Sequence, residues 1–195
     1  MSEATMNPML DLLATRRSVK PDRLAAPGPT PEQLDSILTI AARVPDHKKL
    51  APWRFIVFEG DARFKAGEIF AEASRREDKE PPSDKRIETE RNRLARAPLV
   101  VAVVSRTVDN PFAPEWEQVL SCGAACFNMC LAANAMGFGT NWLTDWVSYS
   151  AHVREGLGLA ANERLAGFVY IGTTMERSPE RERPAIADIV SRWPA

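Results

Sequence analysis

The feature that most constrains this chain is an almost uninterrupted apolar run at residues 98–105, with the sequence PLVVAVVS. A run of this length, rich in β-branched side chains, predicts a buried strand. Residues 53–59 (WRFIVFE) and 165–172 (LAGFVYIG) have the aromatic and β-branched composition of two further strands. Residues 140–144 form a short extended segment after a glycine-containing turn. The chain is therefore expected to build a β-sheet that includes residues 98–105.

Helix signals occupy the long stretches between these strands. Asn7-Pro8 and Thr30-Pro31 each place a capping residue before a proline, and Gln33 completes a capping box with Thr30. Helices are expected over residues 8–16, 31–41, 61–79, 84–95, 115–136 and 148–156. Long helices between the strands of one sheet favour an α+β fold. A length of 195 residues suits a single domain over residues 1–195.

Side-chain patterns add detail to three of these helices. Phe64, Ile69 and Phe70 are expected to point inward from residues 61–79. The charged residues 84–95 are expected to form a solvated helix face and not a binding surface. The long helix is rich in small residues that would let a second helix approach, and Gly137 is expected to end it.

Charge and composition exclude several classes of function. The formal net charge is −1 and both signs are interspersed, so no basic nucleic-acid footprint is present. No apolar stretch is long enough to span a membrane, and no signal-peptide pattern begins the chain, which favours a cytoplasmic protein. The dinucleotide motif G-x-G-x-x-G, the P-loop and G-x-S-x-G do not occur. With two histidines, a histidine-rich metal site is not expected.

The three cysteines lie on one predicted helix. Cys122, Cys126 and Cys130 are spaced four residues apart, so they share one helix face. The outer two are about 12 Å apart, so the three cannot bind one metal ion together. An odd, clustered set in a chain with no export signal also argues against disulfides. We expect small buried residues on a packed face and no metal.

Cationic residues gather after the first two helices. Arg16, Arg17 and Lys20 follow the first, and Arg43, His47, Lys48 and Lys49 follow the second. Cations near a helix C-terminus are favoured by the helix dipole, which is sufficient to explain each cluster alone. Two such clusters can also form an anion site, because guanidinium groups bind phosphate with two hydrogen bonds. Composition does not decide between these interpretations.

An ordered set of short motifs resembles the FMN-dependent nitroreductase family. The motifs, in chain order, are Arg16-Arg17-Ser18, residues 43–48 (RVPDHK), residues 52–55 (PWRF), residues 116–118 (WEQ), residues 137–142 (GFGTNW) and residues 167–172 (GFVYIG). Residues 43–55 are similar to a subgroup of small bacterial NAD(P)H nitroreductases. Because the motifs occur in matching order, the resemblance covers nearly the whole chain.

The resemblance implies a set of cofactor-binding residues. Arg16, Arg17 and Ser18 would hold the phosphate and ribityl chain of FMN, and Lys20 would lie near the flavin ring. Arg43 and His47 would reach the same FMN, and Trp142, Leu143 and Thr144 would contact it from the other subunit's side of the cleft. The electron donor, NADH or NADPH, is associated with Ala132, Ala133, Asn134, Ala135, Met136 and Gly137.

This chain departs from the subgroup at one of these positions. Leu143-Thr144 stands where the subgroup carries Arg-Ser, so one cation of the site is missing or is supplied by another residue. Arg181 and Arg183 in the tail are candidates, although solvated loop charges explain them equally well. Trp142, Trp146 and Tyr149 could line a stacking surface for substrate or could be buried aromatic packing.

The implied protein is a homodimer with a central, mainly antiparallel sheet flanked by helices and a C-terminal tail exchanged between subunits. The implied activity is FMN-dependent NAD(P)H oxidation coupled to reduction of a small electron acceptor, a nitroaromatic or quinone, by ping-pong hydride transfer. Alternatives are dehalogenation or enoyl-type reduction with a lid in residues 73–93, a flavin-binding dimer without useful turnover, and basic clusters that only cap helices.

Overall fold

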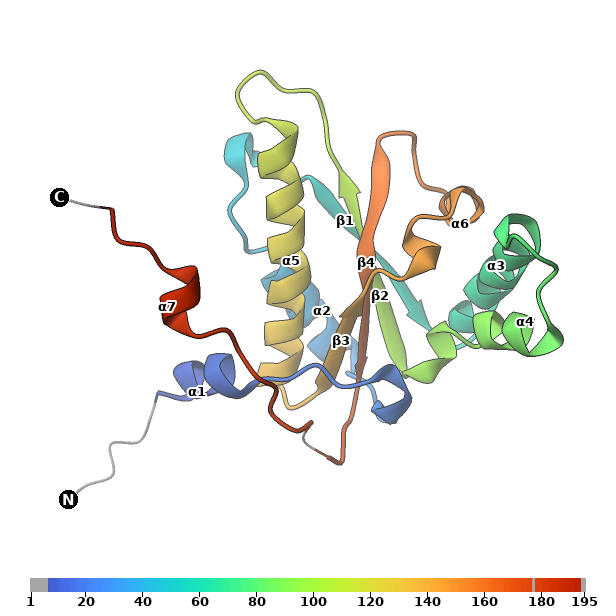
Figure 1. The fold of residues 1–195 in the computed structure, drawn as a ribbon, viewed down its shortest axis with the longest axis horizontal. Helices are drawn as coiled ribbons and strands as arrows, with labels where there is room; N and C mark the ends of the chain where they lie inside the picture. The colour runs from blue at the N-terminus through green and yellow to red at the C-terminus, as the bar shows by residue number, and fades with distance from the viewer. Residues whose placement is uncertain (1–6, 177, 194–195) are drawn as a thin grey trace.

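The computed structural model describes residues 7–176 and 178–193 and contains one four-stranded antiparallel sheet (Figure 1). The strand order is β1 (Trp53–Glu59), β2 (Leu99–Arg106), β4 (Glu163–Gly172) and β3 (Gly139–Leu143). The predicted α+β fold with a mainly antiparallel sheet is confirmed. The short extended segment near residue 140 is a fourth strand, paired with β4 at the edge of the sheet.

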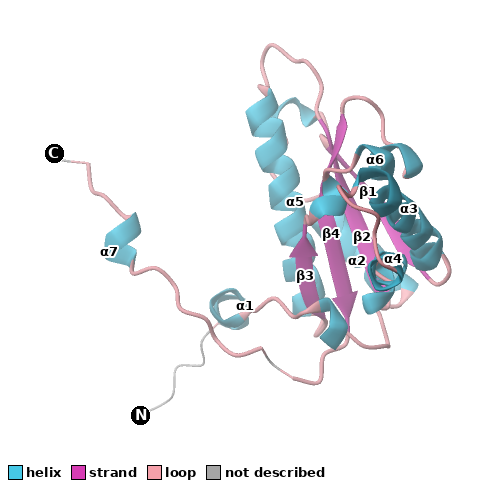
Figure 2. Cartoon of the chain, turned by 45° about the vertical axis from the view of Figure 1, so that its right-hand side comes forward, coloured by secondary structure: helices cyan, strands magenta, loops and turns pink. Residues whose placement is uncertain are grey.

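Helices cover both faces of the sheet. The helices are α1 (Pro8–Thr15), α2 (Pro31–Ala41), α3 (Ala62–Glu77), α4 (Asp84–Arg91), α5 (Glu115–Ala135), α6 (Ala151–Gly156) and α7 (Ile186–Ile189). Figure 2 shows α2 and α5 on one face and α3 and α6 on the other, with α4 beside α3. Both views place α1 and α7 at the edge of the molecule, outside these layers.

The apolar run of residues 98–105 forms the buried strand that the sequence predicts. Val100, Ala102 and Val104 are buried among residues of α3 and α6. Val101 and Val103 are buried on the opposite face, among residues of α2 and α5. Because both faces of β2 are covered, its sequence is apolar at successive positions instead of alternating.

The predicted capping residues of α1 and α2 and the glycine after α5 are also confirmed. The Asn7 side chain accepts a hydrogen bond from the backbone of Met9, and Thr30 and Gln33 form a complete capping box. Gly137 follows α5 with a positive φ of 88°, a conformation that glycine adopts without steric cost.

Two expectations about helix faces are wrong. Phe64 is 45 % exposed, whereas Phe70 is buried. Side chains six residues apart in a helix point in directions about 120° apart around the helix axis, so the two rings do not share one face. Residues 84–95 are not one solvated helix, because α4 ends at Arg91 and a short 3-10 turn follows. Within α4, Glu90 is completely buried, since guanidinium groups on both sides neutralise it.

Cys122, Cys126 and Cys130 are buried and free, as predicted. Burial raises the pKa of Cys130 above that of an ordinary thiol. In the described part of the chain, no cluster of three potential metal ligands is found. No helix among residues 7–176 and 178–193 is long and apolar enough to cross a membrane.

An ion pair joins β1 to β4 across β2. Arg54 Nε and Nη2 donate hydrogen bonds to the two carboxylate oxygens of Glu163 at 2.6 and 2.7 Å. The backbone N–H of Ala160 donates to the same carboxylate at 2.9 Å. The hydrogen bonds from Arg54 lower the pKa of Glu163 from 4.5 to about 2, even though its side chain is only 9 % exposed.

Replacing Glu163 with Gln is therefore expected to destabilise the protein at neutral pH and much less in acid. A carboxyl whose pKa is lowered by folding stabilises the folded state above its ordinary pKa of 4.5, and this contribution is lost as pH falls toward about 2. The shift corresponds to about 3 kcal/mol. Urea unfolding of both proteins near neutral pH and near the lower pKa measures the difference. The same difference at both pH values would contradict this account.

Candidate functional site

Residues next to the two predicted cofactor segments are hydrogen-bonded to each other although they are far apart in sequence. The backbone N–H of Val19 donates to the carbonyl of Thr140 at 2.9 Å, and Asn141 Nδ2 donates to the carbonyl of Val19 at 2.8 Å. Residues 16–20 therefore lie along the outer edge of β3. Since β3 continues into residues 142–144, the fold brings the two predicted FMN segments together.

A small cavity of about 180 Å³ lies where these segments meet the end of α5. Its lining includes Arg16 and Arg17 from the predicted cofactor set and Asn134 and Gly137 from the predicted nicotinamide segment. Asn134 Oδ1 is buried with no hydrogen-bond partner among the described residues. The cavity thus combines cationic groups with an available acceptor.

The remaining residues of the nicotinamide segment differ in exposure. The side chains of Ala132 and Ala133 are buried in the core beside the sheet, so these two residues face away from solvent. Ala135 is exposed and Met136 half-buried at the end of α5. Only the last turn of the segment is therefore accessible to a ligand in this chain.

The C-terminal tail returns to the same place. Arg17, whose side chain is 16 % exposed, donates to the carbonyl of Pro179 and lies 3.7 Å from the carboxylate of Glu180. Ser178 Oγ donates to the carbonyl of Ser18 at 3.1 Å. Arg183 pairs with Glu180 at 3.4 Å, so the candidate tail cations belong to a segment that is anchored at Arg17.

Trp142 lines an apolar cavity of about 560 Å³ between α5 and β4. Its indole Nε1 donates to the carbonyl of Ala166 at 3.0 Å, at a bulge in β4 where Gly167 has a φ of 139°. Leu143 points to the other face of the sheet and packs against the core beneath α3. Because side chains alternate along a strand, Trp142 and Leu143 cannot serve the same cavity.

His47 lies at a third cavity, of about 360 Å³, near the beginning of α5. Its Nδ1 is 2.8 Å from Glu117 Oε2. Leu120 and Ala124 line both this cavity and the Trp142 cavity, so the two are neighbours along α5. Glu117 belongs to the motif of residues 116–118 but was not predicted as a site residue, because an acidic residue in the first turn of a helix is explained by the helix dipole alone.

The three places lie one after another along α5, beside the face that carries Glu117, Leu120 and Phe127. Glu117, Leu120, Ala124 and Phe127 follow each other at helical spacing, and the Arg16 guanidinium lies 5.3 Å from the centre of the Phe127 ring. Glu117 and Phe127 are ten residues apart in sequence, which corresponds to about 15 Å along the helix. Arg16 and His47 of one chain therefore do not meet in one cavity. Arg43 and Lys20 are exposed, and the carbonyl of Arg43 accepts a hydrogen bond at 3.3 Å from Nδ2 of Asn128, the residue after Phe127.

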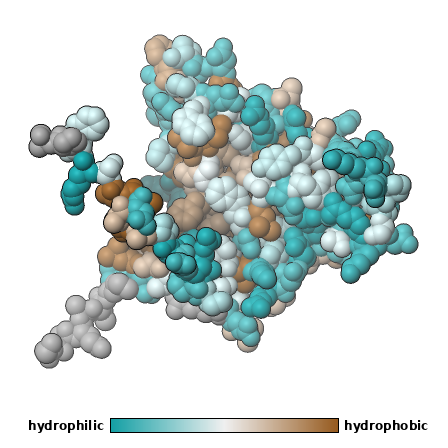
Figure 3. Space-filling model, in the orientation of Figure 1, coloured by the Kyte–Doolittle hydropathy of each residue, from teal (hydrophilic) through white to brown (hydrophobic). Residues whose placement is uncertain are grey.

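This face of α5 carries many exposed apolar side chains. The exposed residues include Trp116, Val119, Leu120 and Phe127. Figure 3 shows apolar residues gathered on the side where α5, α1 and α7 lie, whereas the side of α3 and α4 is mostly hydrophilic. An apolar surface of this kind marks a binding or assembly site.

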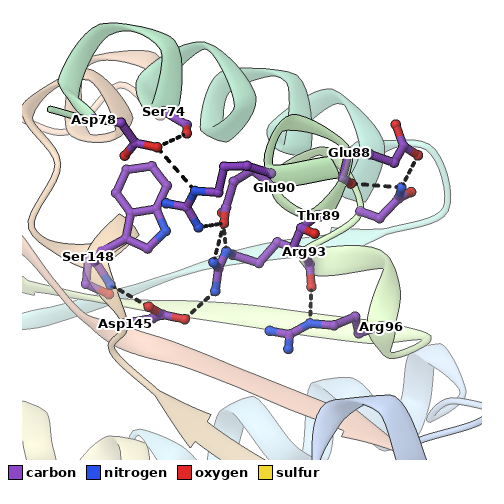
Figure 4. A network of polar contacts seen from close by, with 12 residues as sticks. Ser74, Asp78, Glu88, Thr89, Glu90, Arg93, Arg96, Asp145 and Ser148 are labelled. Atoms are coloured by element: carbon purple, nitrogen blue, oxygen red, sulfur yellow. Dashed lines mark hydrogen bonds and ion pairs between the residues drawn. The ribbon is translucent and has the colours of Figure 1, made fainter. Parts of the chain in front are cut away.

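A buried polar network holds the chain just after residues 142–144 (Figure 4). Arg93 Nε and Nη2 donate to the carboxylate of Glu90 at 2.5 and 2.6 Å, and Arg93 Nη1 donates to Asp145. Asp145 has a positive φ of 52° and accepts from the backbone N–H of Trp146 at 2.7 Å. Burial opposes ionisation of Asp145, but the Trp146 N–H and Arg93 outweigh it and lower its pKa.

The three aromatic residues near this network do not form one stacking surface. Trp142 lines the cavity beside α5, whereas Trp146 packs against the core on the α3 side, with the Arg86 guanidinium 5.0 Å from its ring. Tyr149 is 76 % exposed. The grouping suggested by their closeness in sequence is wrong for Trp146, because it lies on the opposite face of the sheet.

Comparison with known proteins gives consistent results. The model of the family described as "Nitroreductase family" matches residues 13–173. YdjA of Escherichia coli K12, which carries the name of an NAD(P)H nitroreductase, is 40 % identical over 164 residues, covering 84 % of this chain and 87 % of YdjA.

Two solved structures share the fold. A nitroreductase-like family protein from Bacillus cereus has a TM-score of 0.81 at 20 % identity, covering 98 % of this chain and 99 % of that one. A nitroreductase-type protein from Desulfovibrio desulfuricans, solved in complex with FMN, has a TM-score of 0.74 at 24 % identity, covering 97 % and 99 %. Because the family model matches residues 13–173 of this chain and YdjA is 40 % identical over 84 % of it, the chain belongs to the nitroreductase family.

Proposed function

We propose that this protein is an FMN-dependent NAD(P)H oxidoreductase that reduces nitroaromatic, quinone or similar electron-poor acceptors. The observation that carries the proposal is the docking of residues 16–20 on β3, through Val19, Thr140 and Asn141. This docking places guanidinium groups beside the strand that leads to Trp142. A cationic end next to an apolar aromatic end suits a ligand with a phosphate and a flat ring.

The residues present fit FMN by their chemistry. Arg16 and Arg17 supply guanidinium groups for a phosphate, and Trp142 borders an apolar cavity that suits a flavin ring. When bound, FMN supplies the hydride chemistry, and the protein supplies binding and orientation. The D. desulfuricans relative is solved with FMN, and the name of YdjA specifies NAD(P)H.

The other predicted residues have distinct parts in this proposal. Ser18 and Lys20 would add a hydroxyl and a cation on the residue 16–20 segment, and Thr144 would contact the ligand from the end of β3. Leu143 would contribute its backbone only, since its side chain packs against the core. The cation that the subgroup carries at this position would come from Arg181 or Arg183, which follow the contact between Glu180 and Arg17.

We also propose that the protein works as a homodimer, with the tail exchanged between subunits. The described residues of α1 and α7 include no buried side chain, and Leu10, Ile186 and Ile189 are each more than half exposed. A second chain that covers these residues and α5 would bury this surface, and His47 and Arg43 of one chain could then approach the other chain's site. FMN retention should then fall on dilution in step with dimer dissociation. A monomer that keeps stoichiometric FMN would contradict the dimer.

The test of the function is the visible absorption spectrum of the purified protein before and after anaerobic addition of NADH, then NADPH. Flavin bands that bleach with either donor are the expected result. Arg16→Ala should reduce the flavin content by roughly tenfold or more, because it removes a charged phosphate contact. Arg75→Ala, on the exposed surface of α3, serves as the matched control and should leave the flavin content unchanged. Unchanged flavin in Arg16→Ala would remove Arg16 from the site.

The acceptor reaction should show ping-pong kinetics, because donor and acceptor are expected to use one cavity in turn. Parallel lines in a two-substrate double-reciprocal plot are the expected pattern.

A screen of electron acceptors separates this function from its alternatives. The alternatives are dehalogenation, enoyl-type reduction, and flavin binding without turnover. Residues 73–93, in which dehalogenation or enoyl-type reduction would require a lid, belong mostly to α3 and α4. These helices lie on the face of the sheet opposite α5, which favours reduction of nitroaromatic or quinone acceptors over those two alternatives. The sequence predicts a cytoplasmic location, which suits an NAD(P)H-dependent activity.

A further inference from the structure

The loop that carries His47 is attached to α5 at two points. Ser121 Oγ donates a hydrogen bond to the carbonyl of Pro45, and His47 Nδ1 lies 2.8 Å from Glu117 Oε2. Glu117 and Ser121 are four residues apart and share one face of α5. The helix therefore holds the imidazole by its ring and also holds the backbone that leads to it.

The same loop is held from within by Asp46. Its two carboxylate oxygens accept hydrogen bonds from the backbone N–H groups of Leu50 and Ala51, each at 2.9 Å. Lys48, Lys49 and Ala51 have positive φ values of 66°, 55° and 45°, which non-glycine residues rarely adopt. Such a backbone persists only where its surroundings over-determine it, so contacts within the protein hold the loop that carries His47.

The contact with Glu117 also decides which ring nitrogen carries the proton. An ionised carboxylate only accepts hydrogen bonds, so His47 Nδ1 must be the donor. In a neutral imidazole the other nitrogen, Nε2, then has no proton and is an acceptor. The cavity that His47 borders is lined mainly by apolar atoms, and its other lining residues include Pro45, Leu120 and Ala124.

We propose that Glu117 is a positioning residue that fixes His47 as the Nδ1–H tautomer and so presents Nε2 as an acceptor to an N–H or hydroxyl donor of the bound flavin. This inference rests on the proposed function for the identity of the ligand, but the tautomer is a property of the protein alone. Glu115, in the same first turn of α5, lies 3.6 Å from Arg164 and does not contact His47. A role limited to the helix dipole would be shared by Glu115 and Glu117.

The test uses the nitrogen-15 chemical shifts of the histidine rings, measured near neutral pH in the full-length protein without and with FMN. The chain has two histidines, so His152→Gln assigns the His47 signals. Wild type and Glu115→Gln are expected to show the Nδ1–H tautomer. Glu117→Ala is expected to shift His47 toward Nε2–H and to raise the dissociation constant of FMN by about tenfold, as losing the partner that orients a ligand-binding histidine does. Glu117→Gln keeps a carbonyl acceptor and should retain most of the wild-type pattern.

Two results would overturn the proposal. The first is a wild-type His47 with its proton on Nε2, or ring shifts that Glu117→Ala leaves unchanged. The second is a changed tautomer in Glu117→Ala with an unchanged dissociation constant for FMN. If wild type binds no FMN, the proposed function fails, whereas the ring shifts still decide the role of Glu117. Should Glu117→Ala fold poorly, Glu117→Leu, which also lacks an acceptor for Nδ1, replaces it in the same comparison with Glu115→Gln.

Discussion

Glu90→Ala is expected to lower the free energy of unfolding by about 3–5 kcal/mol. Glu90 is completely buried and accepts hydrogen bonds from both Arg86 and Arg93. Removing the carboxylate leaves the Arg93 guanidinium, whose side chain is 8 % exposed, without its two hydrogen bonds to Glu90, and with the partly exposed Asp145 as its remaining acidic partner among the described residues. Breaking one member of a buried ion pair is costly for this reason, although the intact pair itself contributes little net stability.

The matched control for this prediction is Glu88→Ala, on the same helix. Glu88 is 60 % exposed and pairs with Arg91 at 2.8 Å, so its loss should change stability far less than the loss of Glu90, because solvent screens an exposed ion pair. Urea unfolding of wild type and both variants measures the two effects. Similar values for Glu88→Ala and Glu90→Ala would show that the network in Figure 4 is no more than a surface ion-pair cluster.

The same network is connected to the candidate site. Arg93 also binds Asp145, which directly follows Thr144 and holds a positive φ of 52°. A non-glycine residue in such a conformation costs on the order of 1–3 kcal/mol and needs support from its surroundings. Glu90→Ala should therefore also weaken FMN binding through the end of β3, beyond the loss that unfolding alone explains.

Gly167→Ala is expected to cost roughly 2–5 kcal/mol and to displace Trp142. Gly167 has a φ of 139°, and a Cβ atom there would lie 2.5 Å from Trp142 Nε1 and 2.8 Å from the carbonyl oxygen of Leu143. The second contact is with backbone, which cannot turn aside as a flexible side chain can. The indole of Trp142 would have to leave its hydrogen bond to Ala166, so FMN affinity should fall together with stability.

Gly60→Ala separates the effect of backbone conformation from that of crowding. Gly60 also has a positive φ, of 50°, but no atom lies within 4 Å of a Cβ built there. Its substitution should cost about 1–2 kcal/mol, from the left-handed conformation alone, and should leave FMN binding unchanged. Thermal unfolding and a fluorescence titration with FMN measure both variants. Equal effects of the two substitutions would mean that the contact with Trp142 is unimportant.

Much of the fold was predictable because its signals are local. The prolines, caps and glycines that bound α1, α2 and α5 act on residues within one turn, so the sequence indicates these ends directly. The apolar run of β2 likewise predicts a strand wherever it lies in the chain. Phe64 was predicted wrongly because it was grouped with Phe70 without regard to the helical angle between them.

Charged segments were predicted less well, because the environment of a charge depends on distant partners. Residues 84–95 have the composition of a solvated helix, yet Glu90 and Arg93 are buried. Glu90 and Arg93 neutralise each other, and Arg93 also donates a hydrogen bond to Asp145, which is more than fifty residues away in the sequence. No local pattern distinguishes such a carboxylate from an exposed one.

For the candidate site, the family and the residue types were predictable from short motifs that occur in a recognisable order along the chain. Which of these residues meet depends on the three-dimensional arrangement of the elements. Pairing of Val19 with Thr140 and Asn141 brings Arg16 and Arg17 beside β3, and the alternation of the strand sends Trp142 to one face and Leu143 to the other. The contact of His47 with Glu117 joins residues seventy positions apart. These relations depend on long-range packing and strand register, which a local sequence pattern does not specify.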